Sequence, residues 1–202
     1  RMRGRDMFVE ESTNDSEWED FLLASPRGTF YHSSKWKDVI QRSFSHSALY
    51  LVIRDANGEL VGICPGFVIG SMYTKMYQSI PYSDYGGPLI AEHCIKQASR
   101  ALLNFLKGFC SKKDIAYAKI RLMDNKLMQS FQSSSGCVDT STGTVEIDLK
   151  STPSGFIWNK VFSKNTRRRI RVIERDGFQV QEARTKSDLR DFYNLYFENM
   201  IY

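Results

Sequence analysis

Apolar residues follow two kinds of spacing along the first 150 residues. Apolar positions three or four residues apart predict amphipathic helices, whereas alternating or continuous apolar runs predict strands. The predicted strands cover Phe8–Glu10, Ala48–Ile53, Glu59–Ile69, Met72–Gln78, Ala116–Leu122 and Thr144–Leu149. The predicted helices run from Ser16, the expected N-cap, to Ala24, from Ser33 or Ser34 to Ser43, from Cys94 to Cys110 and from Asp124 to Phe131. This mixture of strands and helices predicts an α/β layer fold.

Glycine and proline mark the turns between these elements. Asn57-Gly58 predicts a hairpin, and Pro65-Gly66 predicts a bend within the strand that follows it. From Ser79 to Leu89 the sequence SIPYSDYGGPL combines two prolines, two adjacent glycines and two tyrosines. So dense a set of turn residues predicts a shaped loop between regular elements.

A second group of elements begins after Lys150. It comprises a predicted helix over Pro153–Phe162, a basic helix over residues 164–176, a strand over Phe178–Ala183 and a helix from Ser187, the expected N-cap, to Tyr202. One strand among helices has no partner for its edges, so we expect this second domain to be incomplete in the chain or to be completed by the first. The expected division is therefore 1–7 as an extension or as residues added for expression, 8–150 as the first domain and 151–202 as the start of a second.

The basic helix carries the chain's excess positive charge. Residues Lys160 to Arg175 include seven basic residues and one acidic residue, a net charge of +6, whereas the whole chain has a net charge of +5. Such a segment is either a solvated helix face or a site for phosphate or carboxylate oxygens, which guanidinium groups bind in pairs. Five arginines against two lysines favour the second interpretation, although composition alone leaves both open.

Local signals place the ends and faces of the basic helix. Thr166 or Asn165 can cap its N-terminus, and Gly177 stands where it would end. Arg167, Arg171 and Arg175 are spaced by four residues and share one face.

Composition excludes several classes of protein. With 42% apolar and 13% aromatic residues the chain can bury a core, which excludes general disorder. The longest mostly apolar run, Leu60–Ile69, is too short to span a bilayer, and no signal peptide is visible. Cysteine and histidine spacings fit neither a zinc site nor a disulfide scaffold; these residues are Cys64, Cys94, Cys110, Cys137, His32, His46 and His93. We expect a cytoplasmic protein with reduced, buried thiols, structural side chains at His32 and His46, a surface His93 and no metal.

The order of elements resembles the GNAT acyltransferase fold, and a series of strings sharpens the likeness. In chain order the strings are TFYHSSKWKDVI (Thr29–Ile40), FSHSALYLV (Phe44–Val52), ELVGICPGFV (Glu59–Val68), SIPYSDYGGPL (Ser79–Leu89), TVEIDL (Thr144–Leu149), KNTRRRIRVIERDGFQV (Lys164–Val180) and LRDFYNLYFENM (Leu189–Met200). Their order and spacing resemble the FemAB-like family of tandem GNAT-like acyl- and aminoacyltransferases, related to the enzymes that build peptidoglycan interpeptide bridges in the cell wall. The resemblance implies a GNAT-like mixed sheet flanked by helices, followed by the beginning of a second GNAT-like domain.

The resemblance also implies a function. It implies a transferase that moves an aminoacyl or acyl group onto an amine, with acyl-CoA or aminoacyl-tRNA as the donor to the full-length protein. The implied acceptor is a polyanionic, muropeptide-like molecule, and tRNA is a further implied partner. The residues that match the family's acceptor site lie in the basic helix and in the Ser79–Leu89 loop; they are Lys164, Arg167, Arg168, Arg171, Tyr82, Tyr85, Gly86 and Gly87.

Two positions depart from the patterns of related proteins. GNAT proteins that bind acetyl-CoA present an [RQ]-x-x-G-x-[GA] turn before their long helix, and the segment Tyr82–Leu89 does not fit it. We therefore expect no cofactor in this part of the protein. The muropeptide transferases carry a lysine shortly after the tryptophan matched by Trp36, whereas this chain has Lys37, Asp38 and Ile40 nearby.

Acyl transfer to an amine requires a deprotonated amine and a stabilised oxyanion. Asp84 is a candidate base, with Tyr82 or Tyr85 as hydrogen-bond donors, but an aspartate in such a loop equally suits an Asx-turn. Two alternative functions stay open. One is a non-catalytic GNAT-like binding or scaffold module, and the other is a module that binds the phosphate backbone of tRNA or another nucleic acid.

Overall fold

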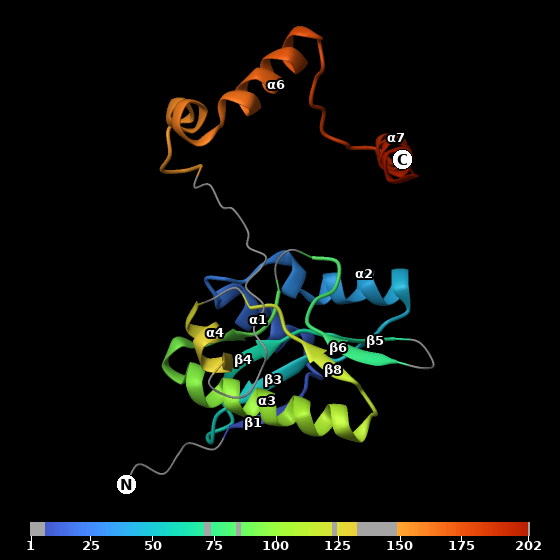
Figure 1. Cartoon of the computed structure of the whole chain (residues 1–202). Helices are drawn as coiled ribbons and strands as arrows, with labels where there is room; N and C mark the ends of the chain where they lie inside the picture. The colour runs from blue at the N-terminus through green and yellow to red at the C-terminus, as the bar shows by residue number, and fades with distance from the viewer. Residues whose placement is uncertain (1–6, 71–73, 84–85, 123–124, 133–148, 202) are drawn as a thin grey trace. The chain divides into compact units, whose positions relative to one another are not determined.

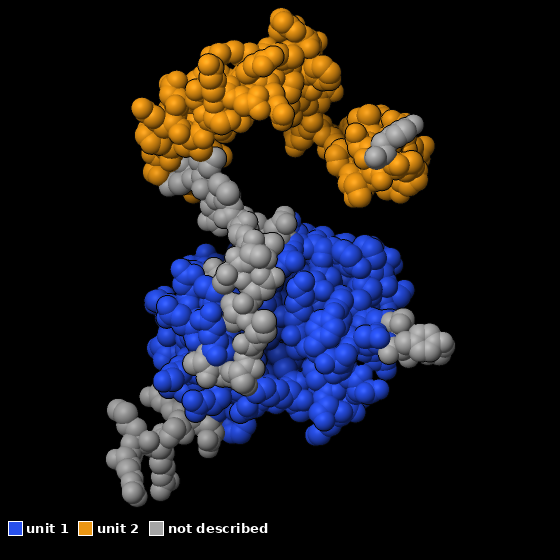
Figure 2. Space-filling view, in the orientation of Figure 1, with its two compact units in different colours: residues 1–144 blue, residues 145–202 orange. Residues whose placement is uncertain are grey.

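The computed structural model describes residues 7–70, 74–83, 86–122, 125–132 and 149–201. The chain divides into two compact units, residues 1–144 and residues 145–202 (Figures 1 and 2). The first unit is α/β, and the predicted fold class is confirmed there.

The strands of the first unit form two sheets. The first sheet is antiparallel, has the order β1-β3-β4-β7 and comprises β1 (Phe8–Glu11), β3 (Leu51–Arg54), β4 (Leu60–Cys64) and β7 (Leu89–Ile90). The second sheet has the order β2-β5-β6-β8 and comprises β2 (Ser47–Ala48), β5 (Phe67–Gly70), β6 (Lys75–Gln78) and β8 (Tyr117–Lys119). Strand β8 runs parallel to β6, and the other pairs of the second sheet are antiparallel.

One hairpin changes sheet in the middle of both its arms. Its first arm forms β2 and then β3, and its second arm forms β4 and then β5. The bend predicted at Pro65-Gly66 is confirmed, and it divides the predicted strand over residues 59–69 into two. Pro65 has no N–H for a sheet ladder. The Gly66 carbonyl accepts a 2.8 Å hydrogen bond from the Leu49 N–H, and a Cβ at Gly66 would overlap the phenol of Tyr77.

The hairpin turn follows the sequence signal closely. The Asp55 carboxylate accepts hydrogen bonds from the N–H groups of Asn57 and Glu59, at 2.8 and 3.1 Å. Gly58 adopts a φ of +85°, which glycine reaches without steric cost. The predicted hairpin is therefore confirmed.

Helices cover both faces of the sheets (Figure 1). They are α1 (Asp15–Ala24), α2 (Ser34–Phe44), α3 (Ile95–Lys112) and α4 (Asn125–Gln132), with short 3-10 turns at Phe30–His32 and Glu92–Cys94. Successive residues of a strand point to opposite faces. Leu51 and Ile53 accordingly pack in one core with residues of α3 and α4, whereas Val52 packs in a second core with residues of α1 and α2.

The second unit contributes only helices among its described residues. They are α5 (Ser154–Phe156), which continues into one π-helical turn η3 (Ile157–Val161), α6 (Lys164–Arg175) and α7 (Lys186–Ile201). The three predicted helices are confirmed. The strand predicted over Phe178–Ala183 is wrong, because no described strand of this unit lies beside it to complete a ladder. Residues 144–148 of another predicted strand lie outside the described residues.

Three predicted helix caps are also wrong by a few residues. Asn14 caps α1, where Ser16 was expected, and Ser163 caps α6 by accepting a 3.1 Å hydrogen bond from the Thr166 N–H. At α7 the Thr185 hydroxyl accepts from the Asp188 N–H, and the Asp188 carboxylate accepts from the Thr185 N–H, so Thr185 takes the place expected for Ser187. In each case the capping side chain lies further toward the N-terminus than expected.

Candidate functional sites

The loop between β6 and β7 brings Tyr82 against His46, which lies between α2 and β2. The Tyr82 Oη and His46 Nε2 atoms are 3.0 Å apart, and the two ring planes differ by 14°. Phe44, at the end of α2, stacks on Tyr82 with a centroid separation of 4.1 Å. We call Phe44, His46 and Tyr82 the ring cluster. The ring cluster therefore contains Tyr82, which was predicted to bind substrate, and His46, which was expected to be a structural side chain.

The backbone around the ring cluster is strained. Left-handed φ values of 54°, 33° and 57° occur at Ser45, Ile80 and Tyr82. Residues other than glycine rarely adopt this region. In the described part of the chain Asp114 is the only further residue of this kind. Such strain persists where surrounding structure enforces it, and it concentrates at functional sites.

The two glycines of the loop serve close packing within the protein. A Cβ at Gly86 would lie 2.9 Å from the Ile80 side chain. Gly87 has a φ of +93°, and a Cβ there would overlap the carbonyl oxygen of Arg121. Their predicted role in binding a ligand stays a prediction. The predicted site residues Asp84 and Tyr85 lie outside the described residues.

His32 is a buried structural residue, as expected. Its Nδ1 atom accepts a 3.3 Å hydrogen bond from the Thr29 N–H, and its carbonyl oxygen accepts a 2.7 Å bond from Trp18 Nε1. Burial lowers the pKa of His32 to about 4, against smaller opposing effects of the Thr29 and Gly87 backbones. The ring is therefore neutral near pH 7.

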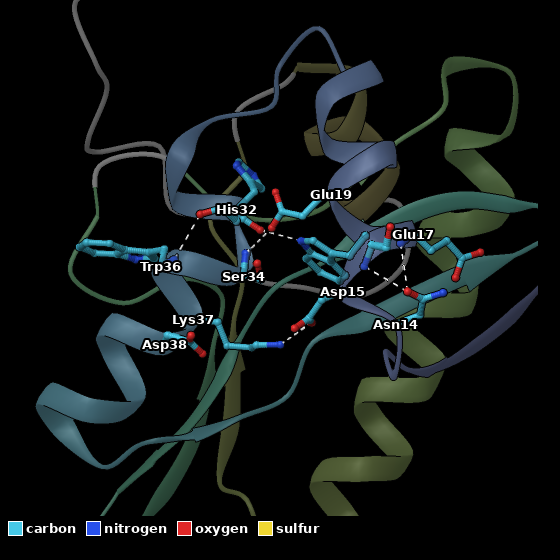
Figure 3. A network of polar contacts seen from close by, with 12 residues as sticks. Asn14, Asp15, Glu17, Glu19, His32, Ser34, Trp36, Lys37 and Asp38 are labelled. Atoms are coloured by element: carbon cyan, nitrogen blue, oxygen red, sulfur yellow. Dashed lines mark hydrogen bonds and ion pairs between the residues drawn. The ribbon is translucent and has the colours of Figure 1, made fainter.

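Two further polar contacts join α1 to α2 (Figure 3). The Glu19 carboxylate accepts a 2.6 Å hydrogen bond from the Ser34 N–H at the first turn of α2. Lys37 Nζ lies 2.7 Å from the Asp15 carboxylate. Lys37 lies near the position where muropeptide transferases carry a lysine. Its ammonium group is therefore paired with a carboxylate of the same chain.

One face of α6 is used for packing within the second unit. Arg167 Nη1 donates hydrogen bonds to the carbonyl oxygens of Phe162, at 2.6 Å, and Trp158, at 3.0 Å. The Arg171 guanidinium lies 5.6 Å from the centre of the Trp158 ring. These two residues, both predicted to bind substrate, hold the end of the preceding helix.

The opposite face of α6 is open. A shallow groove of about 460 Å³ is lined by Asn165, Arg168, Arg169, Val172 and Ile173. The side chains of Arg168 and Arg169 have no hydrogen bond or ion pair with another described residue, and the same holds for Lys164. Arg169 was not among the predicted site residues, although its spacing of four from both Asn165 and Ile173 marks this face.

The N-terminus of α3 carries side chains of both charges. The 3-10 turn that precedes α3 carries Glu92, which pairs with Lys126 at 3.2 Å. Lys96 lines the same groove as Glu92 and Lys126, and the N–H groups of a helix N-terminus favour a phosphate. The expectation that no cofactor binds in this part of the protein stays a prediction.

Other chemistry is limited within the described residues. Cys64 and Cys94 are buried free thiols and Cys110 is partly buried, whereas Cys137 lies outside the described part. His93 is exposed, as expected. No three His, Cys, Asp or Glu side chains gather as metal ligands there. No described helix is long and apolar enough to cross a membrane.

Comparison with solved structures finds similarity to N-acetyltransferases at low scores. Glucosamine-6-phosphate N-acetyltransferase from Arabidopsis thaliana has a TM-score of 0.47 and 9% identity over 71% of this chain and 99% of its own. Ribosomal-protein-alanine N-acetyltransferase from Brucella melitensis biovar Abortus 2308 has a TM-score of 0.48 and 14% identity over 72% of this chain and 100% of its own. No family model matches the sequence, and a comparison with curated proteins gives no match. These similarities carry no functional information by themselves.

Proposed function

We propose that the chain supplies the acceptor-side part of a cytoplasmic FemAB-like transferase, which moves an aminoacyl or acyl group onto an amine acceptor. The order and spacing of the family-like strings support this proposal. The single structural observation behind the proposal is the open face of α6. There Arg168 and Arg169 line one groove and have no hydrogen bond or ion pair with another described residue. A polyanionic, muropeptide-like acceptor from cell-wall synthesis would supply the missing anions.

We propose different roles for the two faces of α6. Arg168 and Arg169 can each grip a phosphate through two parallel N–H groups, and Lys164 adds an exposed ammonium nearby in sequence. Val172 and Ile173 offer apolar contact beside them. Arg167 and Arg171 anchor the helix to Trp158, so we propose that they position the open face.

The transfer itself needs groups that handle a proton and a negative charge. The acceptor nitrogen would attack the acyl carbonyl carbon of the donor. The new bond between nitrogen and carbon would form as the ester or thioester bond of the donor breaks, and the proton of the nitrogen would pass to a base. We propose that the Tyr82 hydroxyl accepts the hydrogen bond from His46 Nε2–H and donates its own proton's hydrogen bond to the developing oxyanion. The roles of Asp84 and Tyr85 stay predictions.

Thermal denaturation of the whole chain with UDP-linked muropeptide tests the acceptor. The test variant is Arg168→Gln with Arg169→Gln, and the control is Arg100→Gln with Arg190→Gln, which removes the same charge from exposed positions on α3 and α7. We expect the muropeptide to raise the melting temperature of the parent and the control but not that of the test variant.

Three other results would lead to different conclusions. If the muropeptide-induced rise in melting temperature is lost equally in both double variants, net charge alone attracts the ligand. A shift with a charged tRNA analogue, but none with the muropeptide beyond that of inorganic phosphate, would favour a phosphate-backbone binding module. An absence of any shift would favour a scaffold.

A further inference from the structure

We propose that the ring cluster of Phe44, His46 and Tyr82 binds a planar heteroaromatic ring of the nucleobase kind by stacking. The three ring planes lie within 22° of one another. His46 and Tyr82 are joined at their edges by the 3.0 Å contact between Nε2 and Oη. We call these two rings, whose planes differ by 14°, the plate.

One face of this plate is covered and the other is accessible. Phe44 lies against the Tyr82 ring at 4.1 Å, which occupies one face of the phenol. Tyr82 nevertheless remains 56% exposed, and Phe44 remains 46% exposed. The uncovered face of Tyr82 can therefore receive a further ring in the same stack.

The fold maintains this exposed stack at a cost. Left-handed backbone at Tyr82 is unfavourable for a residue with a side chain, whereas Ser45 adopts it as the C-cap of α2. The local contacts that hold the loop, such as the 3.0 Å bond from Ser83 Oγ to the Ile80 carbonyl oxygen, do not require Tyr82 to face solvent. A large aromatic side chain held exposed by a strained backbone is better explained by a ligand than by core packing.

The chemistry of the plate favours a nucleobase over an ammonium group. A cation binds an aromatic ring most strongly over tryptophan and at desolvated sites, whereas this cluster has no tryptophan and Tyr82 is 56% exposed. Every nucleobase presents a neutral π-face, and stacking on tyrosine or histidine is a common way to hold one.

This inference shares Tyr82 with the proposed transfer reaction, but it uses the face of the ring, whereas that reaction uses the hydroxyl. Its site lies wholly in the first unit, uses none of the α6 arginines, and its test requires neither an acyl donor nor an amine acceptor. Failure of one proposal therefore leaves the other standing.

Titration of the whole chain with AMP, followed by NMR shifts of the adenine protons, tests the site. Ribose 5-phosphate is the matched ligand without a base. The test variant is Tyr82→Leu, and the control is Tyr117→Leu, because Tyr117 is 53% exposed on β8. We expect Tyr82→Leu to weaken AMP binding by roughly 5- to 100-fold, the usual effect of losing one stacking ring, while the control leaves it unchanged.

Tyr82→Phe separates stacking from hydrogen bonding. It keeps the ring and removes the hydroxyl, so AMP affinity should stay within about threefold of the parent, given the modest net value of one exposed hydrogen bond. If Tyr82→Leu lowers the melting temperature, Phe44→Leu serves as a second variant with the loop intact. The proposal is overturned if AMP fails to bind, if ribose 5-phosphate binds as tightly as AMP, or if Tyr82→Phe loses as much affinity as Tyr82→Leu.

Discussion

Arg167 Nη1 lies 2.6 Å from the carbonyl oxygen of Phe162, five residues earlier in the chain. The π-helical turn η3 ends just before that carbonyl, so the guanidinium satisfies backbone oxygens that a helix end would otherwise leave without partners. Adjacent Arg168 has no such contact among the described residues. Neighbouring arginines of one basic run therefore have different roles.

This division predicts that Arg167 stabilises the second unit and that Arg168 does not. Replacement of Arg167 by lysine loses the fork that reaches several carbonyl oxygens, and it should reduce the protection of the Trp158–Phe162 amides by about 1–2 kcal/mol. Arg168→Lys should leave protection unchanged. Hydrogen exchange of the two variants measures the difference. Equal protection in both would contradict the assignment.

The low pKa of His32 predicts a pH-dependent stability. Above pH 6.5 the ring is neutral in both the folded and the unfolded chain, whereas between 6.5 and about 4 only the unfolded chain takes up the proton. The free energy of unfolding should therefore fall as pH decreases through this window, by about 3 kcal/mol in total. Urea unfolding of the parent and of His32→Gln at several pH values should give a steeper decline for the parent. Parallel curves would show that other groups cause the decline.

The loop glycine Gly87 should tolerate no side chain. Gly87→Ala combines a φ of +93° with an overlap between the new Cβ and the Arg121 carbonyl oxygen, so it should destabilise the first unit by roughly 2–4 kcal/mol. Gly108→Ala is the matched control, because Gly108 lies in α3 with open space around the new Cβ. It should raise stability by about 0.5–1 kcal/mol. A similar melting temperature for both variants would refute the packing described for the loop.

Cys64 should react with thiol reagents only when the protein unfolds. Its side chain is buried, its Sγ lies 3.4 Å from Tyr77 Oη, and burial raises the pKa of the thiol to about 12. The thiolate is the reactive form, so native labelling should be slow and should accelerate with urea. Cys110, which is partly buried, should label earlier in the same sample. Site-resolved mass spectrometry would detect the opposite order if the burial were wrong.

Local sequence signals determined much of the secondary structure. The α/β class, the hairpin at Asn57-Gly58 and the bend at Pro65-Gly66 all follow from short-range preferences of the backbone. The helices were predicted for the same reason, since their apolar spacing is read within a single element. Cap residues were less certain, because several polar side chains near each helix start compete for the same N–H groups. The strand predicted over Phe178–Ala183 failed because a strand needs a partner that its own residues do not supply.

The candidate sites depended on contacts that local sequence does not encode. The two arms of one hairpin divide between two sheets because each half finds different partner strands. His46 and Tyr82 meet across 36 residues of chain, and Arg167 separates from Arg168 because only one of them points toward the preceding helix end. By itself, the sequence determined the elements and the concentration of charge in residues 160–175. The tertiary structure decided which side chains meet and which arginines stay open, because those outcomes depend on how distant segments pack against one another.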